Sequence, residues 1–194
     1  YGLLLGIVLG TNVNTSYGYT GDVGSGVTVS NENVNNTELQ WVDNGGTTIT
    51  TTVNDGGVQA INTGGTATGT IVNDGGVQRV VGKATGTLVN IGGTQKVSGT
   101  STGATIGGTQ YIYGNGHSSS ETIINGGHQD IALGGESTNA TIDAGGKQSV
   151  WGTATGSIVN GDQYLYDGSI SHNVEVQNGG TIQIMEDGTR LTGQ

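Results

Sequence analysis

The sequence contains no cysteine, no proline and no phenylalanine, and only five of its 194 residues are lysine or arginine. Without cysteine, neither disulfide bonds nor thiolate metal sites can stabilise the fold. With so few basic residues and a formal net charge of −10, the chain has no basic patch to replace the counterions of nucleic acid. We therefore expect no nucleic-acid partner.

Long apolar runs are missing as well. The single continuous apolar stretch, residues 3–9, is too short to span a bilayer and lacks the basic start and small-residue cleavage site of a signal peptide. We expect residues 1–36 to form an N-terminal cap or flank.

Glycine is abundant instead, with 40 residues, and it recurs within a repeated phrase. Because glycine weakens helices and the accompanying Thr, Asn and Val favour strands and turns, we expect an all-β chain. Gly-Gly-x-Gln ends at Gln59, Gln78, Gln95, Gln110, Gln129 and Gln148, and looser copies end at Gln40, Gln163 and Gln183. Successive glutamines are 15 to 20 residues apart, most often 19, which is typical of a solenoid.

Each repeat contains two short strand-like segments joined by Asn/Asp-Gly-Gly turns, as in residues 70–81. Such segments could pair as antiparallel hairpins. The similarity of the repeats favours instead one coil per repeat, each strand pairing in parallel with its counterpart about 4.8 Å away in the next coil. We predict a single-stranded parallel β-helix of about nine coils over residues 37–194.

The columns of this stack support the prediction. The residue two after each glutamine is always apolar: Val42, Ile61, Val80, Val97, Ile112, Ile131, Val150 and Leu165. A second apolar column is Val53, Val72, Val89, Ile123 and Ile142. Strand alternation then turns the glutamines inward, where stacked amides can hydrogen-bond along the axis. The alternative is that each glutamine caps a local turn.

Asparagines precede the glycine pairs at Asn54, Asn73 and Asn90, with Asp143 in the equivalent place. We expect these residues to stack at a corner of the coil where the left-handed conformation is tolerated. The paired glycines beside them would supply positive φ.

Catalytic and metal-binding constellations are not evident. Arg79 and Lys96 share an outward column, but no carboxylate pair accompanies them there as polysaccharide hydrolysis would require. The sequence's three histidines, His117, His128 and His172, occupy different columns without metal-ligand spacing. We expect no enzyme activity, no metal and no cofactor.

Aromatic residues form one further pattern. Tyr113, Trp151 and Tyr166 each lie three residues after a repeat glutamine and should form an outward stripe. Exposed rings of this kind can stack on sugar faces. The alternative is that they cover the edges of the sheets.

The repeated phrase, as in residues 52–68, resembles the 19-residue repeat of self-associating autotransporter adhesins, the AIDA and antigen-forty-three type passengers of Gram-negative bacteria. The resemblance covers about residues 37–190. It implies a right-handed, three-faced β-helix that is exported through the outer membrane to the cell surface. It also implies homotypic cell–cell association, autoaggregation, biofilm formation and, in some members, attachment to host cells.

The resemblance further implies a polar self-association surface, with the same protein on neighbouring cells as partner and host glycan or protein as a second one. The matching positions are Asn54, Asp55, Asn73, Asp74, Asn90 and Asn125. The family's C-terminal membrane barrel is not in this sequence, so we expect a piece of a longer passenger. The alternatives are a carbohydrate- or host-receptor-binding β-helix, a polysaccharide-processing enzyme, or a scaffold alone.

Overall fold

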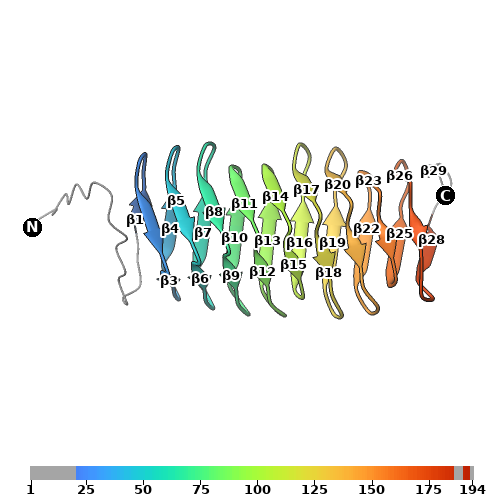
Figure 1. Cartoon of the computed structure of the whole chain (residues 1–194), viewed down its shortest axis with the longest axis horizontal. Coiled ribbons are helices and arrows are strands. Elements are labelled where there is room, and N and C mark those ends of the chain that lie inside the picture. Colours follow the sequence, from blue (N-terminus) through green and yellow to red (C-terminus); the bar gives the residue numbers. More distant parts are fainter. Residues whose placement is uncertain (1–20, 186–189, 193–194) are drawn as a thin grey trace, which may run out of the picture.

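The chain folds into a parallel β-helix in which every complete coil contributes one strand to each of three sheets (Figure 1). This computed structural model describes residues 21–185 and 190–192, and within them it contains 29 strands and no helix. All the pairings between these strands are parallel, so the predicted coil stacking is confirmed and the hairpin alternative is wrong. Of the expected cap at residues 1–36, residues 1–20 lie outside the described residues.

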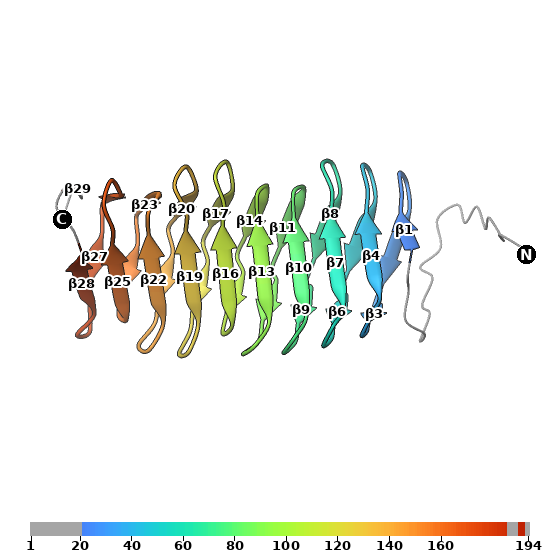
Figure 2. The same ribbon diagram turned by 180° about the vertical axis from the view of Figure 1, so that it is seen from behind.

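The first sheet has the longest strands, which lie side by side in Figure 2. In order they are β1 (Gly21–Val23), β4 (Leu39–Val42), β7 (Val58–Ile61), β10 (Val77–Val80), β13 (Thr94–Val97), β16 (Thr109–Ile112), β19 (His128–Ile131), β22 (Lys147–Val150), β25 (Asp162–Leu165) and β28 (Thr181–Ile184).

The second and third sheets complete each coil. The second contains β2 (Thr28–Ser30), β5 (Thr47–Ile49), β8 (Thr66–Thr68), β11 (Lys83–Thr85), β14 (Thr100–Thr102), β17 (His117–Ser119), β20 (Glu136–Thr138), β23 (Thr153–Thr155), β26 (Ile170–His172) and β29 (Arg190–Thr192). The third contains β3 (Asn33–Val34), β6 (Thr52–Val53), β9 (Ile71–Val72), β12 (Leu88–Val89), β15 (Thr105–Ile106), β18 (Thr122–Ile123), β21 (Thr141–Ile142), β24 (Ile158–Val159) and β27 (Glu175–Val176).

The β-helix extends further towards the N-terminus than the repeat pattern indicates. Strands β1, β2 and β3 pair in parallel with β4, β5 and β6, so one coil precedes residue 37. In β1, Gly21 occupies the position of the repeat glutamine. Because this coil lacks the glutamine and the full Gly-Gly turn, the sequence pattern does not reveal it.

The glutamines form a continuous internal ladder. From Gln59 onward, the side-chain Nε2 of each donates to Oε1 of the preceding one at 2.6 to 2.8 Å. All members are fully buried: Gln40, Gln59, Gln78, Gln95, Gln110, Gln129, Gln148 and Gln163. The amide ladder is therefore confirmed over the local-cap alternative. The assignment of Gln183 to this column is wrong, since Ile182 pairs with Gln163 and Gln183 is exposed.

Small residues of the second sheet make room for the glutamines. The inward position of its strands holds Thr48, Ala67, Ala84, Ser101, Ser118, Ser137, Ala154 and Ser171, all buried. Their hydroxyls supplement the ladder, as when Gln59 Nε2 donates to Thr48 Oγ1 at 3.1 Å and Gln129 Nε2 to Ser118 Oγ at 3.3 Å. An amide has two donor hydrogens, so one can serve the ladder and the other a hydroxyl.

The glycine pairs serve two different purposes. The first glycine of a pair has positive φ, 70° at both Gly56 and Gly75, except at the pair that begins with Gly107. The left-handed residue of the turn is thus the glycine, as predicted, and neither Asn54 nor Asn73 has positive φ. The second glycine permits close approach of two coils, because a Cβ at Gly57 would lie 2.2 Å from the carbonyl oxygen of Val34.

Shortened coils lose residues at the corners and keep their strands. The turn from the first to the second sheet shrinks to Val81-Gly82 after β10, as predicted for the segment between Gln78 and Gln95. Similar short turns follow β13 and β22, and the loops there are visibly lower in Figure 1. The corners therefore tolerate deletion because the strand register does not depend on them.

Two carboxyl groups are buried, those of Glu32 and Glu121. Glu121 is 1% exposed, and its Oε2 accepts the backbone N–H of Ala104 in the neighbouring coil. Desolvation by burial is the main cause that raises the pKa of Glu121 from 4.5 to about 7, although hydrogen bonds from Ser101 and Ala104 oppose it. The native state therefore favours the protonated form of this carboxyl.

Replacing a central glutamine should destabilise the solenoid strongly. Gln110→Leu removes the donor to Gln95 Oε1 and the acceptor of Gln129 Nε2, and each buried group left without its partner costs about 1–3 kcal/mol. We expect a loss of about 2–6 kcal/mol in the free energy of unfolding, measured by denaturant titration. Gln183→Leu is the exposed control, and equal effects of the two changes would contradict the ladder.

Substitution of the second glycine of a pair should also be costly. Gly57→Ala places a methyl group against the Val34 carbonyl, and overpacking of this kind costs about 1–3 kcal/mol. Gly24→Ala is the matched control, because a Cβ there meets no atom within 4 Å. Thermal unfolding of both variants measures the difference, and a Gly57→Ala protein as stable as its control would refute the close approach.

Glu121 should make stability depend on pH in one direction. Its folded-state pKa is raised, so its stabilising contribution is complete below the unfolded pKa of 4.5 and is lost as the pH rises through about 7. In Glu121→Gln, which stays neutral, stability relative to the parent should rise by about 3 kcal/mol between about pH 4 and pH 8. Unfolding titrations across this range measure it, with exposed Glu175→Gln as control; a flat difference for Glu121→Gln would contradict the assignment.

Candidate functional site

The predicted self-association residues lie on turns from the third sheet to the first. We call Asn54, Asp55, Asn73, Asp74 and Asn90 the Asn/Asp corner. The half-buried asparagines form a second amide ladder that begins at Asn35, with Nδ2 to Oδ1 distances of 2.9, 2.8 and 2.9 Å up to Asn90. Their amides are therefore engaged within the chain and hold the corner together.

The aspartates of the corner face solvent. Asp55 and Asp74 are exposed, and each leans over the first glycine of the next coil. A Cβ at Gly75 would lie 2.0 Å from Asp55 Oδ1, so only glycine admits this position of the carboxylate. The two carboxylates form a short acidic row along the axis.

Asn125 is not part of this group. It occupies the same column as the aspartates and is exposed, but the coil between Asn90 and Asn125 has the shortened turn Gly107-Gly108 in place of the corner. Two coil rises, about 10 Å, therefore separate Asn125 from the coil of Asn90. The structure brings together five of the six predicted residues.

Two basic residues lie beside the acidic row. Arg79 and Lys96 are register partners on β10 and β13, as predicted from their shared outward column. Arg79 lies in the strand that follows the turn of Asp74, and its side chain is exposed. The acidic row precedes β7 and β10 and the basic pair lies on β10 and β13, so the two share the coil of β10.

The aromatic stripe is brought together only in part. The rings of Trp151 and Tyr166 stack with centroids 4.2 Å apart and planes 8° apart. Tyr113 lies two coils before Trp151, with Ala132 in the intervening coil, and pairs instead with Tyr111 of its own strand at 6.3 Å and 25°. Ala132 thus interrupts the predicted stripe.

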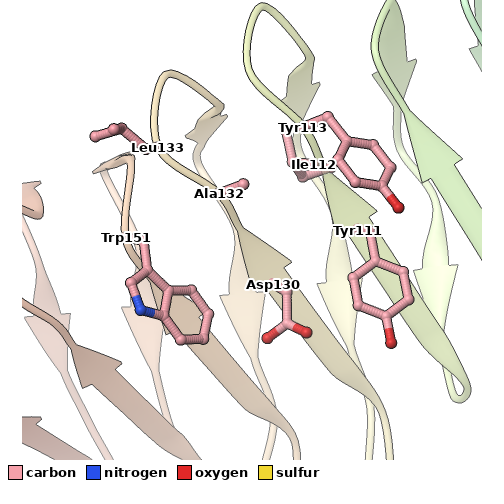
Figure 3. Close-up of a pocket in the computed structure, with 7 residues that line it drawn as sticks. All are labelled: Tyr111, Ile112, Tyr113, Asp130, Ala132, Leu133 and Trp151. Carbon is pink, nitrogen blue, oxygen red and sulfur yellow. The ribbon is translucent and has the colours of Figure 1, made fainter.

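The interruption leaves a groove of about 350 Å³. Figure 3 looks into it and shows Tyr111 and Tyr113 on one side of Ala132, Trp151 on the other, and Asp130 between them. Leu133, which is 79% exposed, lies at its rim. Asp130, Ala132 and Leu133 were not predicted as site residues, although a small residue among aromatic residues of one column is the signal that could have found them.

Two histidines lie next to carboxylates, and one of these carboxylates is that of Asp130 in the groove. His128 Nε2 lies 2.7 Å from Asp130 Oδ1 and 3.1 Å from Ser149 Oγ, and His117 Nδ1 lies 3.1 Å from Glu136 Oε2. Among the residues that the structure describes, no three His, Cys, Asp or Glu side chains are placed to hold a metal ion. The same residues include no helix long and apolar enough to cross a bilayer.

Comparison with known proteins supports the resemblance found in the repeat. No protein-family model and no curated protein matches the sequence. Among solved structures, the chain is similar to a fragment of TibA that was hyper-glycosylated by TibC, with 26% sequence identity and a TM-score of 0.65. The match covers 89% of this chain and 86% of the TibA fragment, so the likeness extends over nearly the whole β-helix and supports an adhesin-type passenger.

Proposed function

We propose that the chain is the adhesive stalk of a surface-exported passenger protein that joins cells by binding a second copy of itself, leading to autoaggregation and biofilm formation. The observation that carries this proposal is the likeness to the TibA fragment over 89% of the chain at 26% identity. A rod of stacked coils can bind a second copy at many points, because its outward columns repeat polar groups at a constant spacing.

The charges beside the Asn/Asp corner suggest how two copies would meet. Asp55 and Asp74 repel a second acidic row, but Arg79 and Lys96 on the adjacent strands are complementary to it. A two-fold axis between the rows would place each acidic row against the basic pair of the other copy. An isologous contact of this kind satisfies both rows at once.

Each contact between two chains would be weak, but the combined binding of many chains would be strong. An exposed ion pair contributes about 0.2–1 kcal/mol, far too little for a stable dimer of isolated chains. Many passengers on two apposed cells bind together, and such multivalency raises avidity by about 100-fold or more without new contacts. The proposal therefore concerns cells that display the chain rather than the free chain.

Charge exchange tests the surface directly. Cells that display Asp55→Lys with Asp74→Lys should not clump, and neither should cells that display Arg79→Asp with Lys96→Asp, because each variant repels itself. When the two populations are mixed, both rows are again complementary and clumping should return. Settling and two-colour microscopy measure this, with mixed-colour clumps as the expected result.

The controls separate folding from contact. Asn44→Lys with Thr63→Lys introduces the same charges at exposed positions of the opposite corner and should leave clumping unchanged. Asn125→Lys shows whether the surface continues beyond the shortened turn. Clumping of the Asp→Lys cells like the parent would refute the assignment to the corner, and failure of parent cells to clump would refute homotypic adhesion itself.

A further inference from the structure

The aromatic groove is a second surface, separate from the Asn/Asp corner. The corner precedes the first-sheet strands on the coils of Gln59 to Gln95, whereas the groove follows those strands on the coils of Gln110 to Gln148. The proposed self-association surface comes closest to the groove at Lys96, the register partner of Tyr111.

The groove is created by one substitution in a column. The position three after each repeat glutamine is aromatic at Tyr113, Trp151 and Tyr166, but alanine at 132. Two coil rises, about 10 Å, separate the backbones that carry Tyr113 and Trp151, and Ala132 leaves the space between them unfilled. The lining side chains Tyr111, Tyr113 and Trp151 are each only 36% to 41% exposed, so much of their surface is held in place by packing.

The chemistry of the lining combines flat apolar faces with hydrogen-bonding groups. The rings present their broad faces in the view of Figure 3, and the phenol hydroxyls and the indole N–H lie at their edges. Asp130 adds a carboxylate whose Oδ1 is fixed by His128 at 2.7 Å. A pyranose offers the complementary surface, because one face of its ring is apolar and its rim carries hydroxyls that need both donors and acceptors.

The arrangement of the rings argues against an organic cation. A cage for a quaternary ammonium group surrounds one point with ring faces. Here the planes of Tyr111 and Tyr113 differ by only 25°, and Trp151 is stacked on Tyr166 at 8°, so the ring faces within neither pair converge on one point.

The charge of the site selects among sugars. The groove contains Asp130 and no cationic side chain, and the whole chain carries a formal net charge of −10. An acidic glycan would be repelled. We propose that the groove formed by Tyr111, Tyr113, Asp130, Ala132 and Trp151 binds a neutral saccharide.

Tryptophan fluorescence offers a direct assay with purified protein. The sequence has two tryptophans, so Trp41→Phe leaves Trp151 as the only reporter. Titration with neutral oligosaccharides built from glucose, galactose, mannose or N-acetylhexosamine should give a saturable change with at least one of them. Ala132→Tyr, which fills the gap, should weaken binding at least tenfold, while Ala144→Tyr, at an exposed turn elsewhere, should not.

Further variants and ligands in the same titration identify the class of ligand. Asp130→Asn keeps a hydrogen-bond acceptor and should weaken saccharide binding only a few-fold, whereas loss of the carboxylate would abolish binding of a cation. Binding of tetramethylammonium without any of the saccharides would overturn the proposal, and so would the absence of any saturable change in protein with unchanged circular dichroism. Because this assay uses free chain, its failure leaves the clumping experiment unaffected.

Discussion

Register between successive coils is the constraint on which the rest of this structure depends. Each strand pairs in parallel with the equivalent strand of the next coil, so equivalent residues lie about 4.8 Å apart in straight columns. The buried glutamine ladder follows the same direction, with seven amide hydrogen bonds from Gln40 to Gln163. A slip by one residue would turn every glutamine outward and bury the mixed outward column in its place, so the amides specify the register as well as stabilise it.

Once register is set, the outer surface is free to vary. Corners can lose a turn, as at Val81-Gly82 and Gly107-Gly108, without disturbing the sheets. Outward columns can carry charges or rings, so a binding surface arises by placing similar residues on neighbouring coils. The acidic row of Asp55 and Asp74 is a surface of this kind, whereas the groove arises where the small residue Ala132 lies between the aromatic residues Tyr113 and Trp151.

The sequence was sufficient for the fold because the inward columns repeat. The glutamines and the apolar residues two positions later were placed correctly, and the structure confirms them as buried. What repeats poorly was missed: the first coil, which has Gly21 in place of glutamine, and the outward position of Gln183. The sites were harder to predict. Asn125 shares a column with Asp74, yet a shortened coil separates the two. Ala132 contributes to the groove because its small side chain leaves space between its neighbours.

Hydrogen exchange of the glutamine side-chain amides, followed by nuclear magnetic resonance, tests the central claim most directly. Nε2 hydrogens of the ladder from Gln59 to Gln163 should exchange only when coils separate, and so far more slowly than those of exposed Gln183. Protection of the whole ladder, with loss spreading to neighbouring coils when one glutamine is replaced, is the result expected. Exchange as fast as that of Gln183 would contradict an amide ladder that holds the coils in register.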